Sequence, residues 1–327
     1  MRCRLSRQKI PLSVCLELTY RCNARCRFCM IGDRSCEEMD TGEIVPLIDE
    51  LHRGGMRRLG LTGGEALLRD DLPEIIRHAR QKGIYVTVNS NGLLVIDRRD
   101  RLRDANALVL SLNGERETHE ATKDGTSHSA VLAAIEWAVR EGKDVVTITT
   151  LTGGNLSAIP DLLRTARRMS FWATFQPVLL CGSLHSFPAD IDFDRKAMAQ
   201  AAVQLAAAKR TGWPVANTHL YLRYWRDFYS AEIAPRPSRC GVSDHFCTIS
   251  PDGTITPCNL APHNLPYRNG REAGFLRAFQ DMPAANCSSF CAGPYFELDR
   301  LFRLNPEAWL NGAHIVAGRQ RATRAAR

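Results

Sequence analysis

The stretch SVCLELTYRCNARCRFC (residues 13–29) places three cysteines directly after an apolar run that predicts a strand. Cys22, Cys26 and Cys29 have the spacing C-x3-C-x2-C. Three thiols this close together predict a metal or cluster site, yet a structural zinc site needs four ligands and an iron–sulfur cubane is normally held by four cysteines. With three cysteines, one iron keeps an open coordination position, which is typical of a site that binds a substrate. Cys36 is the alternative fourth ligand for a zinc ion, although its offset is not a familiar zinc spacing.

Short β-rich runs alternate with amphipathic helical patterns along most of the chain that follows. The expected strands cover residues 13–20, 57–63, 84–90, 107–114, 144–150 and 172–180. The expected helices cover residues 42–55, 71–83, 129–142, 156–169 and 193–212, and an aromatic-rich one covers 218–230. Repeated strand–helix units imply parallel strands joined by right-handed crossovers. We therefore expect an α/β fold, a partial (β/α)6 TIM-like barrel, with a doubly wound sheet as the alternative.

Composition limits the classes of function. The chain has 327 residues, of which 44% are hydrophobic and 24% charged, and its net charge is +8. No basic stripe with interleaved aromatic residues is present, so we expect no nucleic-acid partner. No apolar run is long enough to cross a membrane and the N-terminus lacks an apolar signal core, so we expect a cytoplasmic protein. The chain has twelve cysteines, and in a reducing compartment those in clusters are expected to act as metal ligands rather than to form disulfides. Cys3, Cys15, Cys36 and Cys181 stand apart from the clusters and are expected to be free thiols.

The cysteine spacing after the first expected strand resembles that of the radical S-adenosylmethionine superfamily, and further motifs fit in order. Gly63, Gly64 and Glu65 follow the second strand and resemble the family's GGE motif, which binds the methionine amino group of the cofactor. Two glycines allow the backbone to approach a ligand closely, and a carboxylate pairs with an ammonium group.

Polar segments also follow the later strands. NSNG (89–92) and SLNG (111–114) look like the family's TNG and SLDG segments, which implies that Asn89 and Ser111 contact the ribose and the carboxylate of the cofactor. Asn155, after the fifth strand, resembles a polar position on the adenine side. Ordinary strand-to-helix turns are the alternative explanation, because turns favour Asn, Ser and Gly.

The resemblance implies a [4Fe–4S] cluster whose open iron binds S-adenosylmethionine. An electron from an external donor such as flavodoxin or ferredoxin then cleaves the cofactor, and the resulting 5′-deoxyadenosyl radical abstracts a hydrogen from the substrate. A non-catalytic iron–sulfur electron carrier is the less favoured alternative, because it would not need the GGE motif.

A second group of cysteines lies near the end of the chain. Its members are Cys240, Cys247, Cys258, Cys287 and Cys291. The spacing Cys240-x12-Gly253-x4-Cys258 resembles the signature of SPASM and twitch extensions, which hold auxiliary [4Fe–4S] clusters. The cysteines are too few for two such clusters, so the resemblance implies one, held by Cys240, Cys258, Cys291 and either Cys247 or Cys287. A structural zinc site with the same thiolates is the alternative.

These patterns predict three parts of the chain: a core barrel over residues 1–234, a cysteine-rich auxiliary domain over 235–318 with a hairpin at 248–258, and a basic tail over 319–327. For the substrate we expect a small molecule, such as a sugar or a cofactor precursor. The alternative is a precursor peptide. The first strand is expected near residue 13, which leaves no room for a preceding peptide-binding winged helix. This makes the precursor peptide the less favoured substrate.

Overall fold

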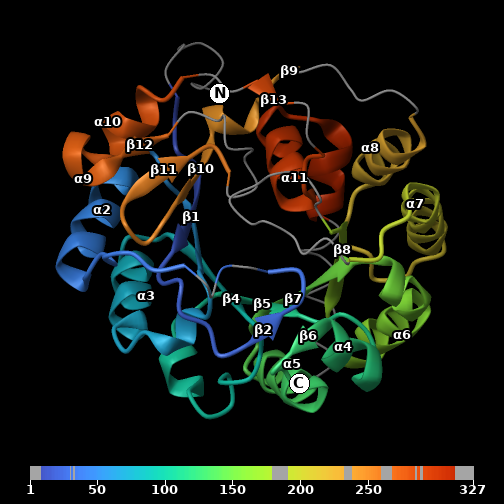
Figure 1. Ribbon diagram of the computed structural model, residues 1–327. Coiled ribbons are helices and arrows are strands. Elements are labelled where there is room, and N and C mark those ends of the chain that lie inside the picture. The colour runs from blue at the N-terminus through green and yellow to red at the C-terminus, as the bar shows by residue number, and fades with distance from the viewer. Residues whose placement is uncertain are drawn as a thin grey trace.

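A nine-stranded sheet forms the centre of the computed structural model (Figure 1). The structure describes residues 9–29, 31, 34–178, 191–231, 238–258, 267–283, 286–287 and 290–313, with the backbone alone at 238–239 and 286–287. The strand order is β12-β11-β10-β1-β3-β4-β5-β7-β8. The predicted basic tail at 319–327 lies outside the described residues.

Six parallel strands make up the main part of this sheet. They are β1 (Ser13–Glu17), β3 (Arg58–Thr62), β4 (Tyr85–Ser90), β5 (Ala107–Ser111), β7 (Asp144–Leu151) and β8 (Trp172–Pro177). Each pairs in parallel with the next in this order. All six were expected from the sequence, and the α/β barrel-like architecture is confirmed. Because the strands are parallel, the loops after them gather at one edge of the sheet.

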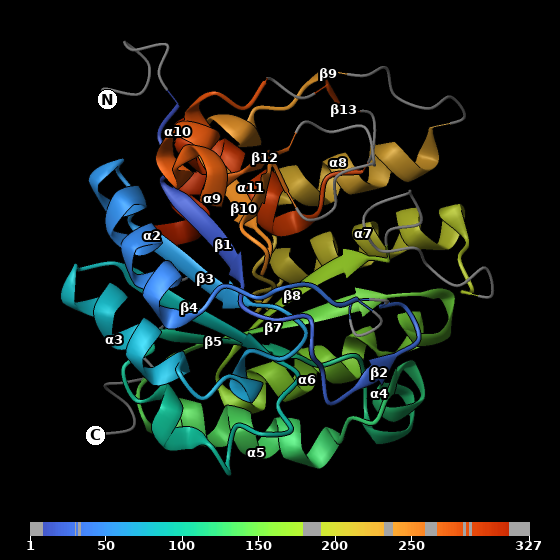
Figure 2. The same ribbon diagram turned by 60° about the vertical axis from the view of Figure 1, so that its left-hand side comes forward.

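Amphipathic helices cover the outer face of the sheet (Figure 2). They are α2 (Thr41–Arg53), α3 (Leu72–Gln81), α5 (His128–Arg140), α6 (Ile159–Met169), α7 (Arg195–Arg210) and α8 (His219–Ser230). Helix α2 shows why they form: Asp40 and Glu43 make a capping box at its start, and Ile44, Leu47 and Leu51 repeat at helical spacing and are buried. No described helix is both long and apolar enough to cross a membrane.

The segment after residue 238 continues the same sheet. Strand β10 (Phe246–Ile249) pairs in parallel with β1, and β11 (Thr254–Thr256) and β12 (Arg268–Asn269) follow in antiparallel order. The predicted hairpin is confirmed, and its turn needs Gly253, whose φ is +84°. The described strands after the boundary expected near residue 235 therefore belong to the same sheet as the barrel strands before it.

The C-terminal helices dock against the barrel on the side of α2. Helix α9 (Gly270–Ala273) contains Arg271, whose guanidinium makes two hydrogen bonds to Glu43, at 2.7 and 2.8 Å. Helix α10 (Phe275–Gln280) follows, and the carboxylate of Glu50 accepts the backbone N–H groups of Phe275 and Leu276 at its start. These two glutamates fasten the C-terminal segment to the first helix of the barrel.

The same segment also docks at the far side of the sheet. In α11 (Gly293–Phe302), the ring of Phe296 stacks on Tyr224 of α8 at 4.8 Å between centroids, and Phe290 stacks on the same tyrosine at 5.2 Å. Trp225 is fully buried beside them. The aromatic stripe of α8 is therefore core packing, as its helical spacing predicts.

Candidate active site

The loop that follows β1 contains the first three cysteines. Cys22, Cys26 and Cys29 are all half-buried, and the N–H of Cys29 donates to the carbonyl of Cys26 at 3.0 Å. The loop is fastened at its middle by a two-residue strand, β2 (Arg25–Cys26), which pairs antiparallel with β6 (Lys123–Asp124), the segment after α4 (Arg116–Thr122). Figure 1 shows β2 and β6 together beside α4.

The thiols of this loop suit a cluster by their chemistry but are not yet arranged around one. Burial raises the pKa of Cys22 and of Cys29, and the neighbouring Cys26 raises both further, because each thiolate disfavours the next. Among the described residues, no three Cys, His, Asp or Glu side chains converge in the geometry of a metal site. Three thiols on one loop still match the donor set of a cluster with one open iron, and binding would turn them toward a common centre.

The Gly-Gly-Glu turn after β3 lies directly against the cysteine loop. The N–H of Gly64 donates to the carbonyl of Thr19 at 2.7 Å, and the N–H of Glu65 donates to that of Arg21 at 2.9 Å. A Cβ atom at position 64 would lie 2.2 Å from the Arg21 carbonyl oxygen, and Gly63 has a φ of +143°. Only glycines fit here, because the two backbones are in contact.

Glu65 joins the turns after β3 and β4. Its side chain is fully buried, and its carboxylate accepts hydrogen bonds from the N–H of Leu67 at 3.2 Å, the N–H of Asn91 at 2.9 Å and the hydroxyl of Ser90 at 3.1 Å. Burial raises the pKa of this carboxyl group, and these hydrogen bonds oppose the rise. The structure thus gives Glu65 a role in holding two loops together, while its pairing with a cofactor ammonium stays a prediction.

Asn91 is the site residue that the sequence did not single out. Its Nδ2 atom donates to Oδ1 of Asn23 at 2.8 Å and lies 4.0 Å from the sulfur of Cys22. It therefore links the turn after β4 to the cysteine loop. Asn89, predicted to contact the cofactor, is two residues earlier in the same segment and half-buried within β4. The sequence signal for Asn91 was its position directly before the glycine of NSNG, which corresponds to the asparagine of the family's TNG segment.

The remaining predicted cofactor contacts differ in exposure. Ser111 is half-buried at the carboxyl end of β5, on the same edge of the sheet as the loop after β1. Asn155 is fully buried, and its amide binds backbone groups: it accepts from the N–H of Thr152 and donates to the carbonyls of Asn113 and Thr150. Its predicted contact with adenine stays untested, and its hydrogen bonds favour a structural role.

The second cysteine group is only partly described. Cys240, Cys258 and Cys291 are half-buried and lie against the hydrophobic core, whereas the side chain of Cys287 lies outside the described residues. Cys247 is fully buried in β10, and this burial strongly raises the pKa of its thiol. Its place inside the sheet makes Cys247 the less suitable of the two candidates for the fourth ligand.

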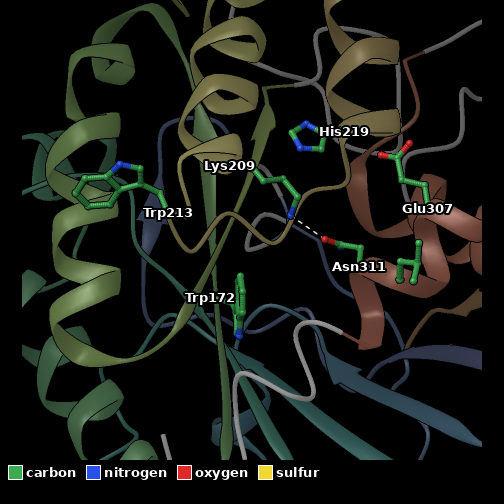
Figure 3. Close-up of a pocket in the computed structure, with 8 residues that line it drawn as sticks. Trp172, Lys209, Trp213, His219, Glu307 and Asn311 are labelled. Carbon is green, nitrogen blue, oxygen red and sulfur yellow. Dashed lines mark hydrogen bonds between the residues drawn. The ribbon is translucent and has the colours of Figure 1, made fainter. Parts of the chain in front are cut away.

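A cavity of about 310 Å³ lies at the opposite end of the sheet (Figure 3). Trp172, which begins β8, forms part of its wall, together with Lys209 of α7. The ammonium of Lys209 donates to Oδ1 of Asn311 at 2.7 Å, and Glu307 accepts the N–H of Leu220. These hydrogen bonds join the helix at residues 306–313 to α7 and α8. The cavity therefore lies at the contact between these helices, away from the cysteine loop.

Comparison with known proteins decides the class of the site. Residues 16–166 match the family model described as the Radical SAM superfamily. The chain carries a radical SAM domain. Radical SAM domains use a [4Fe–4S] cluster and S-adenosylmethionine, and the chain is therefore a radical SAM enzyme.

Two kinds of relative extend this radical SAM match. The PqqA peptide cyclase of Rhodopseudomonas palustris is 28% identical over 274 residues, which cover 77% of this chain and 68% of the relative. The GTP 3′,8-cyclase 1 of Mycobacterium tuberculosis is 30% identical over 185 residues, which cover 52% of this chain and 50% of the relative. The similarity to the peptide cyclase therefore takes in much more of the chain.

Solved structures confirm the radical SAM fold. SuiB of Streptococcus suis bound to S-adenosylmethionine superposes with a TM-score of 0.68 at 15% identity, over 84% of this chain and 67% of SuiB. The protein anSMEcpe, solved with AdoMet and the Cp18Cys peptide, gives a TM-score of 0.61 at 16% identity, over 83% of this chain and 78% of anSMEcpe.

Proposed function

We propose that this radical SAM enzyme modifies a peptide substrate. The observation that carries the proposal is the extent of the similarity to PqqA peptide cyclases, which covers 77% of the chain. The match to the radical SAM family model ends at residue 166, and the similarity to the peptide cyclase includes residues outside that match. The small-molecule substrate that we expected from the sequence is not supported by this comparison, and the peptide alternative fits better.

The residues of the cysteine loop would hold the reactive centre. Cys22, Cys26 and Cys29 supply three thiolates, and reductive cleavage of S-adenosylmethionine is the chemistry that a cluster with an open iron supplies when bound. Gly63 and Gly64 keep the neighbouring backbone free of side chains, which leaves room for a ligand beside the loop. An external donor such as flavodoxin or ferredoxin would deliver the electron.

An auxiliary cluster in the C-terminal segment is part of the proposal. Cys240, Cys258 and Cys291 are its ligands, and Cys287 is a better fourth than Cys247, which is buried inside the sheet. Such a cluster would accept or return an electron during substrate oxidation or bond formation. A zinc ion with the same ligands is distinguished by metal analysis, since it would leave about four irons per chain instead of about eight.

Short peptides encoded beside the gene provide the direct test. The reconstituted enzyme is incubated anaerobically with dithionite, S-adenosylmethionine and each peptide, and the peptides are analysed by mass spectrometry. We expect one peptide to lose hydrogen or gain a crosslink in step with 5′-deoxyadenosine release. GTP is tested in parallel because of the partial similarity to GTP 3′,8-cyclase. Conversion of GTP with no change in any peptide would overturn the proposal.

A further inference from the structure

Lys123 lies in β6, the strand that pairs with β2 of the cysteine loop. Its backbone is the partner of Cys26 in that pairing, and its ammonium nitrogen lies over the ring of Phe28 at 5.8 Å from the centroid. Both contacts belong to the segment between Cys22 and Cys29. The side chain is thus directed along the loop that carries the three thiols.

Lys123 is a buried residue, and the structure shows no hydrogen bond or ion pair of its ammonium group among the described residues. The residue is only 5% exposed. Its charge also acts on the buried carboxyl group of Glu65, where it favours the anionic form. Because the residue is buried, its charge acts on anionic groups in the neighbouring loop with little screening by water.

The other cations of the loop are placed differently. Arg21, Arg25 and Arg27 are exposed, so water screens their charges. Lys123 is the buried cation beside the thiols, and its field is screened less.

We propose that Lys123 sets the reduction potential of the cluster held by Cys22, Cys26 and Cys29. A [4Fe–4S] cluster on three thiolates is an anion, and accepting one electron makes it more negative. A nearby buried cation stabilises the reduced form more than the oxidised form, and therefore raises the potential. This inference rests on the proposed function, because it requires a cluster in this loop. Lys123 would act on the reductive step through the cluster, without contacting the substrate.

The test measures the midpoint potential of the reconstituted cluster without S-adenosylmethionine, by dithionite titration followed with electron paramagnetic resonance. The signal of this cluster is the one that changes when S-adenosylmethionine is added afterwards. We expect Lys123→Met to shift the midpoint to a more negative potential and Lys123→Arg, which keeps the charge, to restore most of it.

Lys143→Gln is the matched control. Lys143, directly before β7, also lies over an aromatic ring, the indole of Trp137, at 5.9 Å from the centroid. Its ammonium is hydrogen-bonded to the carbonyls of Arg103 and Ala105, away from the cysteine loop. The Lys143→Gln substitution should leave the midpoint potential of the cluster unchanged. A wild-type midpoint in Lys123→Met would overturn the inference, even if binding of S-adenosylmethionine weakens, because Lys123 would then serve only the cofactor. Failure of the wild type to assemble a cluster would instead overturn the proposed function.

Discussion

The carboxylate of Glu65 accepts the backbone N–H of Asn91 at 2.9 Å, which ties the turn after β3 to the turn after β4. Asn91 in turn donates to Asn23 in the cysteine loop at 2.8 Å. Three loops that follow three parallel strands are thus held by one short chain of hydrogen bonds. Because buried polar groups are costly when unpaired, this chain gives the site a defined shape before any cofactor binds.

Glu65→Ala should lower the free energy of unfolding of the metal-free protein by about 1–3 kcal/mol, because the N–H groups of Leu67 and Asn91 and the hydroxyl of Ser90 lose a buried acceptor. Urea denaturation measures the change. Glu74→Ala, on the exposed face of α3, is the control and should change stability by no more than about 0.5 kcal/mol. Equal effects of the two substitutions would show that the Glu65 hydrogen bonds do not hold the loops.

Gly64→Ala should also destabilise the metal-free protein, by about 1–3 kcal/mol, because the new Cβ would lie 2.2 Å from the backbone oxygen of Arg21 and must push the two loops apart. Gly154→Ala is the control, since its nearest neighbour would be Oγ1 of Thr152 at 3.7 Å. Denaturation curves compare the two. A neutral Gly64→Ala would mean that the loops are not in backbone contact in solution.

Asn91→Ala should weaken retention of the cluster, because the cysteine loop loses its hydrogen bond to the turn after β4. A loss of about 1 kcal/mol corresponds to roughly five-fold faster release of iron to a chelator. Absorbance during chelation follows the release. Asn89→Ala, two residues earlier, should retain iron as the wild type does, and matching losses in both variants would contradict the role assigned to Asn91.

Glu297 should make stability depend on pH. Burial raises the pKa of this carboxyl group from 4.5 to about 7 in the folded state. The folded protein therefore binds a proton more tightly than the unfolded chain, so Glu297 lowers the free energy of unfolding as the pH rises from about 4.5 to 7. Glu297→Gln keeps an oxygen to accept the N–H of Thr218 and should flatten this slope in urea denaturation at pH 5 and 7.5. An unchanged slope would contradict the assignment.

The six barrel strands could be predicted from the sequence because each is a short apolar run between clear helical patterns. The GGE turn and the cysteine loop could be predicted because glycines and cysteines at fixed spacing have few other uses. The parallel pairing of β10 with β1 could not, since it joins segments more than 200 residues apart in the sequence and no local pattern specifies it.

The parts of the site that the sequence did not reveal depend on tertiary contacts. The β2–β6 pairing involves two residues on each side, which is too short for any periodic signal. Lys123 reads as an ordinary surface lysine in the sequence, and its burial against Phe28 follows only from that pairing. Cys247 reads as a ligand candidate, and its burial follows from the position of β10 inside the sheet.

The release of 5′-deoxyadenosine tests the central claim most directly. The reconstituted protein is incubated anaerobically with dithionite and S-adenosylmethionine, and the product is quantified by chromatography for the wild type and for Cys22→Ala, Cys26→Ala and Cys29→Ala. The account predicts 5′-deoxyadenosine from the wild type and none above background from the three variants. Equal amounts from the wild type and any of these variants, or none from the wild type, would contradict it.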